Sequence, residues 1–125
     1  MRKPGRSELR LRIVLRPGAA LGPGKIDLLE AITETGSIRA AGSRFKMSYR
    51  RAWSLIAELN LMFKTPLVIA ETGGRGGGGA TLTPLGRKVV ERFRAMEAGS
   101  WSVVEADFNA LASELKKPKK VKPRS

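Results

Sequence analysis

Two helix starts lie close together in the middle of this chain, within GSIRAAGSRFKMSYRRAWSLIAELN at residues 36–60. Ser37 precedes a short stretch, Ile38–Phe45, and Ser48 precedes a longer one. A serine oxygen in this position accepts a hydrogen bond from a free N–H group of the first helical turn, so each serine predicts a helix start. Two capped helices joined by a few residues predict a helix-turn-helix.

The second helix has an apolar side and a polar side. Its apolar residues recur at three- and four-residue spacing, which predicts a face packed on a core; they are Ala52, Leu55, Ile56, Leu59, Met62 and Phe63. In a helix-turn-helix the N-terminal residues of the second helix meet base edges in the DNA major groove. The residues that this predicts to face base edges or adjacent phosphates are Ser48, Tyr49, Arg50, Arg51 and Ser54. The alternative is that Arg50 and Arg51 are the solvated face of an ordinary amphipathic helix.

Other side chains near these helices have weaker signals. Trp53 is expected to pack in the core or between helices, whereas Tyr49 fits either packing or DNA contact. Arg39 is placed to reach a phosphate near the start of the first helix, although a solvated arginine is an equal alternative. The full set of candidate DNA-backbone contacts is Ser37, Arg39, Thr83, Arg87 and Lys88.

Two short strands, 67–72 and 80–83, follow the helices and are joined by a glycine-rich loop. A β-hairpin directly after a helix-turn-helix predicts a wing lying along DNA. Arg75 is the only long side chain of the loop, and narrow minor grooves attract arginine, so Arg75 is the candidate contact at the wing tip. The alternative is a mobile tip with a solvated arginine. A nucleotide-binding loop is disfavoured because no Gly-Lys-Ser/Thr closes the loop before a helix.

The segments before and after the helix-turn-helix and its hairpin also have strand and helix signals. Residues 8–16 alternate as a strand, with Leu9, Leu11, Ile13 and Leu15 on one face, and PGAALGPG then breaks the chain. A helix is expected to begin at Pro23 or Gly24 and to run through Thr35, with Gly36 as its stop. Thr83 caps a final helix that has Pro84 in its first position. Its apolar stripe shifts register around 99–101, which predicts either a kink or two helices.

That stripe continues far beyond what one small core can cover. Its early members are Leu85, Val89, Phe93 and Met96, and its later ones Val104, Phe108, Leu111 and Leu115. The excess predicts homodimerisation through the C-terminal helix.

The net charge of +13 is concentrated in parts of the chain. Residues 1–16 carry six basic residues and one acidic residue, and residues 116–125 carry six basic residues and no acidic one. Residues 36–96 carry eleven basic residues and three acidic ones. This distribution predicts a polyanionic partner, double-stranded DNA, with the tails adding salt-sensitive attraction.

The composition also excludes whole classes of function. The chain has no cysteine and no histidine, which removes disulfides, thiol catalysis, imidazole catalysis and the common zinc sites. Its acidic residues are scattered and no nucleophile has a base, so we expect no enzyme, no catalytic residue, no metal and no cofactor. Without an apolar run of about 18 residues or a signal peptide, we expect a soluble cytoplasmic protein with no membrane contact.

Three stretches together resemble the N-terminal DNA-binding domain of ModE-type, molybdate-responsive transcriptional regulators, which share a LysR-like winged helix. These are IDLLEAITETGSIRAAG, then MSYRRAW with LNLMF, then PLV and GGRGGGGATLTPLG, over about residues 25–95. The resemblance implies a dimeric winged helix with its recognition helix in the major groove. Longer members carry molybdate-binding domains after this unit. The chain ends at Ser125, so we expect it to lack them, and any effector, including molybdate or tungstate, is unknown.

The expected fold is α+β and mostly helical: a winged helix-turn-helix with an N-terminal strand, a two-stranded wing and a long C-terminal dimerisation helix. The expected division is a disordered basic tail at 1–7, a DNA-binding domain at 8–96, a dimerisation helix at 97–115 and a second basic tail at 116–125. The expected function is sequence-specific transcriptional regulation. A sequence-independent architectural DNA-binding protein of the nucleoid type is the alternative, and partner binding without DNA through the long apolar helix is a further one.

Overall fold

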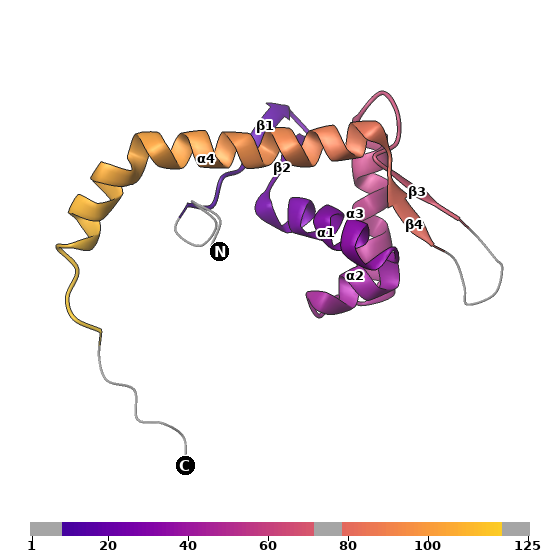
Figure 1. The fold of residues 1–125 in the computed structure, drawn as a ribbon, viewed down its shortest axis with the longest axis horizontal. Helices are drawn as coiled ribbons and strands as arrows, with labels where there is room; N and C mark the ends of the chain where they lie inside the picture. Colours follow the sequence, from indigo (N-terminus) through magenta and orange to yellow (C-terminus); the bar gives the residue numbers. More distant parts are fainter. Residues whose placement is uncertain (1–8, 72–78, 119–125) are drawn as a thin grey trace, which may run out of the picture.

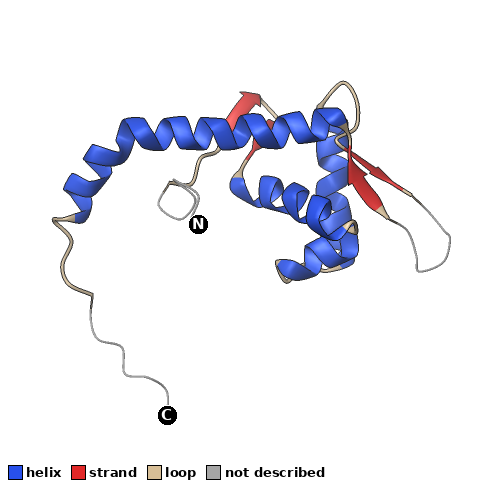
Figure 2. Ribbon diagram, in the orientation of Figure 1, coloured by secondary structure: helices blue, strands red, loops and turns tan. Residues whose placement is uncertain are grey.

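The computed structural model describes residues 9–71 and 79–118. Their elements, in chain order, are β1 (Ile13–Arg16), β2 (Ala19–Leu21), α1 (Pro23–Thr35), α2 (Ile38–Arg44), α3 (Tyr49–Met62), β3 (Val68–Ala70), β4 (Ala80–Leu82) and α4 (Pro84–Ala112). The first three helices gather beside one half of α4, and the β3–β4 hairpin projects from the same end (Figure 1). Among the described residues, the strands form two small antiparallel pairs (Figure 2). The expected mostly helical winged helix-turn-helix is confirmed.

Helix α1 is the centre of the core. Ile26, Leu28, Leu29 and Ile32 are completely buried on it. Pro23 occupies the start of the helix, and Gly36 ends it as predicted, with a left-handed φ of 69° and an N–H bond of 2.7 Å to the Ile32 carbonyl. Helices α2, α4 and strand β4 all pack on α1, so it holds the other elements in place.

Helices α2 and α3 cross closely because a glycine faces an alanine. A methyl group placed on Gly42 would lie 2.8 Å from the Cβ of Ala52, and both residues are buried. The two alanines before Gly42 differ in their environment: Ala40 is exposed and Ala41 is buried. The turn between the helices includes Lys46 at a left-handed φ of 58°.

The N-terminal strand is shorter than predicted and has a partner that the sequence did not reveal. Only Ile13–Arg16 forms a ladder, and it pairs with Ala19–Leu21, part of the segment expected to be a simple break. The pairing stops early because Gly22 and Pro23 begin α1. A register shift between Val14 and Arg16 falls at Leu15. Leu15, expected on the same face as Leu11 and Ile13, is consequently 54% exposed.

Helix α4 is one continuous helix through Gly99, and its last turns bend away from the line of the first (Figure 1). Val89 and Phe93 are buried as predicted, but Met96 is 40% exposed. The buried stripe advances four residues at a time, so its next position is Glu97, which is only 3% exposed. A carboxylate occupies the place expected for an apolar side chain.

Candidate nucleic-acid interface

The two predicted serine caps fix the starts of α2 and α3. Ser37 Oγ accepts from the Ala40 N–H at 3.0 Å, and Ser48 Oγ accepts from the Arg51 N–H at 3.1 Å. Each hydroxyl keeps its own proton for donation to another acceptor. The caps therefore hold the first turn of α3 in a defined position without using up the donor capacity of either serine.

The exposed face of α3 lies opposite its buried stripe. Ala52, Leu55, Ile56 and Leu59 are buried, and successive helical residues are about 100° apart around the axis. Arg50 and Ser54 fall near the middle of the opposite side, and both are exposed. Tyr49 and Trp53 lie on one flank of this exposed side, and Arg51 lies on the other. The structure thus brings together most of the predicted base-contacting residues on one surface, although Arg51 points to a different flank.

Trp53 is not a core residue. It is 52% exposed, and it lines a shallow pocket of about 480 Å³ with Tyr49, Arg50 and Ser54. The expected core position is wrong because Trp53 falls outside the buried arc of α3. Besides Tyr49, Arg50 and Ser54, its neighbours include Ile38 of α2 and Val68 of the wing, with which it lines a second pocket of about 310 Å³.

Arg39 links α2 to this surface. Its guanidinium carbon lies 4.4 Å from the centre of the Tyr49 ring, a cation–π contact, and Tyr49 itself is 43% exposed. The two predicted candidates are therefore neighbours. The contact orients the tyrosine ring beside the first turn of α3.

The β3–β4 hairpin is anchored to the helices by backbone and amide contacts. Asn60 on α3 accepts from the N–H groups of Leu67 and Val68 at 2.8 and 3.1 Å and donates to the Val68 carbonyl at 3.1 Å. The Ala80 N–H donates to the Gly36 carbonyl at 2.9 Å. The predicted wing is therefore fixed relative to α3, and the sequence pattern gave no sign of the part played by Asn60. The candidate tip residue Arg75 lies outside the described residues.

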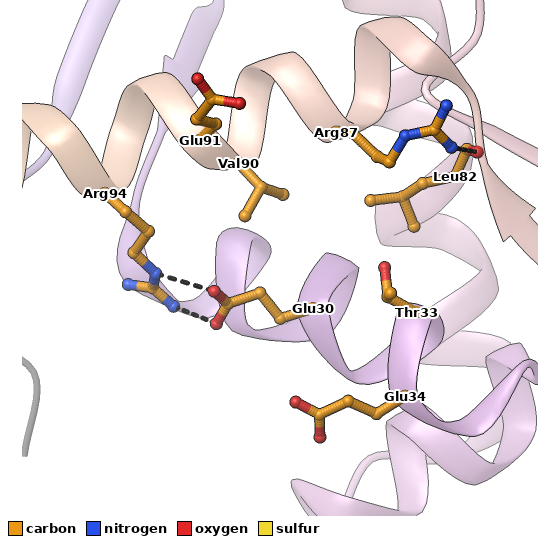
Figure 3. Close-up of a pocket in the computed structure, with 8 residues that line it drawn as sticks. All are labelled: Glu30, Thr33, Glu34, Leu82, Arg87, Val90, Glu91 and Arg94. Carbon is orange, nitrogen blue, oxygen red and sulfur yellow. Dashed lines mark hydrogen bonds and ion pairs between the residues drawn. The ribbon is translucent and has the colours of Figure 1, made fainter. Parts of the chain in front are cut away.

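Thr83 and Arg87 are engaged within the fold. Thr83 Oγ1 accepts from the Gly86 N–H at 3.0 Å, which confirms the predicted cap of α4, and donates to the Pro66 carbonyl at 2.8 Å. Arg87 donates to the Leu82 carbonyl at 3.0 Å. Arg87 lines a pocket of about 370 Å³ between α1 and α4 (Figure 3), separate from the pocket on α3. The structure does not bring these two residues together with the α3 surface.

A partly buried ionic cluster joins α1 to α4. Arg94 Nη2 lies 2.6 Å from Asp27 Oδ1 and 2.7 Å from Glu30 Oε1, and Arg94 Nη1 lies 2.8 Å from Glu97 Oε1. Figure 3 shows the paired contacts of Arg94 with Glu30. Burial alone would lower the pKa of Arg94, but its hydrogen bonds to Glu30, Glu97 and Asp27 outweigh burial and raise the pKa above its ordinary value. The cluster keeps Arg94 charged.

Sequence reasoning missed this cluster, since Asp27 and Glu30 are far from Arg94 along the chain. The i, i+3 spacing of Arg94 and Glu97 was the only available signal. Among residues 9–71 and 79–118, no group of histidine, cysteine or carboxylate side chains is arranged to hold a metal ion. Within the same ranges, no helix combines the length and the apolar character needed to cross a membrane.

A capped two-helix unit with an exposed basic second helix and an anchored β-hairpin defines a winged helix-turn-helix protein. Residues 24–87 match the family of bacterial regulatory helix-turn-helix proteins of the LysR type. The chain belongs to that family.

Its relatives include the regulators that the sequence motifs indicated. The molybdenum-pterin-binding protein MopB of Rhodobacter capsulatus is 42% identical over 87 residues, which are 70% of this chain and 32% of MopB. The molybdenum transport protein ModE of Azotobacter vinelandii is 45% identical over 80 residues, 64% of this chain and 30% of that protein. The DNA-binding transcriptional dual regulator ModE of Escherichia coli is 36% identical over 87 residues, 70% of this chain and 33% of that protein. The resemblance to ModE-type regulators is confirmed, and the chain spans about a third of the length of these relatives.

Proposed function

We propose that this chain is a transcriptional regulator that binds double-stranded DNA and recognises its base sequence through α3. The observation that carries the proposal is the exposed surface of Arg50, Ser54 and Trp53, opposite the buried stripe of a capped helix. Membership of a family of regulatory helix-turn-helix proteins supports it, as does the DNA-binding regulator among the relatives.

Arg50 has the main part in base recognition. An arginine donates two hydrogen bonds to the O6 and N7 acceptors of guanine, which contributes roughly 1–3 kcal/mol of discrimination against other bases. Ser54 lies one helical turn from Arg50 and donates to either a base edge or a phosphate. Trp53 and Tyr49 add apolar surface of the kind that contacts the thymine methyl group. Ser48, at the start of the helix, faces the adjacent backbone.

The same regulator acts as a homodimer through the second half of α4. Val103 and Leu111 of α4 are 79% and 73% exposed, and Leu115, just after the end of the helix, is 76% exposed. Trp101 and Phe108 lie in the same half of α4, and their rings meet edge to face at 5.0 Å. Apolar side chains exposed along one helix favour a partner helix. At micromolar concentration, sedimentation equilibrium should give twice the monomer mass of 13.6 kDa. The dimer proposal fails if the mass is that of a monomer.

We assign the cell cytoplasm as the place of action and no enzymatic role, in keeping with a family of regulators. No effector is assigned. The names of two relatives concern molybdenum, but each match covers about a third of that relative.

Sequence-independent, architectural DNA binding is the second candidate, and the distribution of basic residues toward the ends of the chain favours it. Counterion release would then dominate, and affinity would fall steeply with salt without any preferred site.

The test is a selection of bound fragments from random duplex DNA at about 150 mM salt, close to physiological ionic strength. The full chain is compared with Arg50→Ala, which removes only an exposed side chain. We expect an enriched motif with two-fold symmetry for the full chain and a motif degenerate at one position per half-site for Arg50→Ala. Equal retention of all sequences by both proteins would reject base recognition and favour the architectural candidate.

A further inference from the structure

A second basic pocket lies next to the recognition helix, on the side away from Trp53. It has a volume of about 510 Å³ and is formed by the segment before β1, the start of α1 and one flank of α3. Four of its lining residues are cationic: Arg10, Arg12, Lys25 and Arg51. Among the residues that the structure describes, no aspartate or glutamate lines it. Its charge therefore suits an anion.

The cationic side chains of this pocket have hydrogen-bond donors available for an anion. The side chains of Arg10, Arg12 and Arg51 are exposed. Lys25 donates one proton to the Ala20 carbonyl at 3.2 Å, and an ammonium group has two more to donate. The start of α1 adds to the positive potential, since its N-cap Gly22 supplies no side-chain acceptor.

The position of Arg51 indicates which anion this is. Arg51 follows Arg50 in α3 and points about 100° away from it, on the flank opposite Tyr49 and Trp53. A helix in the major groove has base edges in front of it and a phosphate backbone on each side. With Arg50 toward the base edges, Arg51 and the pocket behind it face one of these backbones.

We propose that this pocket binds a backbone phosphate of the DNA duplex, and that Arg51 contacts this phosphate instead of a base. The inference rests on the proposed function and deepens it, because it divides two adjacent arginines into a sequence-reading residue and a positioning residue. Arg12 and Lys25 hold the same phosphate from the N-terminal segment and from α1. The contact fixes the rotation of α3 in the groove.

The experiment compares Arg51→Ala, Arg12→Ala and Lys25→Ala with Arg50→Ala, on the selected DNA site and on a scrambled duplex. Arg16→Ala is the matched control, since Arg16 is an exposed arginine of the same N-terminal hairpin that does not line the pocket. Each pocket variant should lose affinity equally on both duplexes. Each should also flatten the dependence of log affinity on log salt by about one unit per lost phosphate contact. Arg16→Ala should change the slope less.

Single methylphosphonate linkages, which remove one phosphate charge, locate the contact. In the wild-type chain, one position beside each half-site should weaken binding strongly. The same linkage should weaken Arg51→Ala less than it weakens the wild-type chain, because the two changes remove a shared interaction, while Arg12 and Lys25 keep the rest of their attraction to that phosphate. A change of preferred base in Arg51→Ala, or independent losses at every linkage, would overturn the inference.

The two proposals fail in different ways. If the wild-type chain enriches no motif, base recognition itself is rejected. If it enriches a motif and Arg50→Ala loses it, while the pocket variants keep the wild-type affinity and salt slope, only the phosphate pocket is rejected. Circular dichroism of each variant confirms that the fold is retained.

Discussion

The arginine between α1 and α4 and the arginines on α3 are the same residue type in opposite circumstances. The Arg94 side chain is 13% exposed and is surrounded by the carboxylates of Asp27, Glu30 and Glu97. Arg50 and Arg51 are exposed on a helix whose other side is buried. The charge of Arg94 is paired within the chain and holds two helices together. The charges of Arg50 and Arg51 are available to an external anion, which is the requirement for binding DNA.

The largest effect that follows from this contrast is on folding. Arg94→Met should lower the free energy of unfolding by about 3–5 kcal/mol, because it leaves the buried Glu97 carboxylate without its partner. Denaturant unfolding measures this loss. Arg92→Met, an exposed neighbour on the same helix, is the control and should change little. Equal losses in the two variants would mean that the ionic cluster does not join the helices.

A smaller effect is expected where α4 meets the wing. Gly86→Ala would place a methyl group 2.2 Å from the Leu67 carbonyl oxygen, so the helix or the wing must shift at a cost of about 1–3 kcal/mol. A methyl group placed on Gly99 would meet no described atom within 4 Å outside the surrounding turns of its own helix, and alanine there should stabilise the helix by about 0.5–1 kcal/mol. Thermal unfolding should therefore move in opposite directions for the two variants. A shift of the same sign in both would contradict the close approach.

Trp53→Ala should weaken DNA binding while changing the stability of the fold only slightly. A buried tryptophan would cost about 3–5 kcal/mol when truncated, but Trp53 is half exposed, so we expect a loss of stability below about 1 kcal/mol. Affinity for the selected DNA site should fall, and replacing a contacted thymine by uracil should weaken the wild-type chain more than the variant. The contact is rejected if stability falls by several kcal/mol while DNA affinity, measured on the folded fraction, stays the same.

The smallest effect is expected for an ion pair that is exposed. Glu34 and Arg44 pair between α1 and α2 with side chains 62% and 45% exposed. Exposed pairs contribute only about 0.2–1 kcal/mol. Glu34→Ala should therefore change the denaturation midpoint slightly, and high salt should abolish even that difference. A loss of unfolding free energy as large as that of Arg94→Met would contradict the difference expected between buried and exposed ion pairs.

Local signals in the sequence predicted much of the fold. Ser37, Ser48 and Thr83 each accept the expected N–H bond at a helix start, and Gly36 ends α1 as expected. These features depend on a few consecutive residues, so their chemistry can be read directly. The apolar stripe of α3 was also correct, because a 3.6-residue period is unambiguous over four turns.

The features that the sequence did not reveal depend on distant partners. Glu97 is buried beside Arg94, which lies one turn earlier on α4 and also pairs with Asp27 and Glu30 of α1; no local pattern predicts a buried carboxylate. Trp53 was assigned to packing from its residue type, although its angle on α3 places it outside the core. Arg51 was grouped with Arg50 because they are adjacent in sequence. The angle of about 100° between successive helical residues separates them, and the pocket with Arg10, Arg12 and Lys25 lies on the flank of Arg51.

The central claim is that the exposed charge of α3 reads DNA sequence. It is tested most directly by the ratio of affinities for the selected site and for a scrambled duplex, measured at one fixed salt concentration for the wild-type chain and for Arg50→Ala. The account predicts a wild-type ratio of at least about 10³, and a ratio about 5- to 150-fold smaller for a folded Arg50→Ala variant, which corresponds to roughly 1–3 kcal/mol. A wild-type ratio near one, unchanged by the substitution, would contradict it.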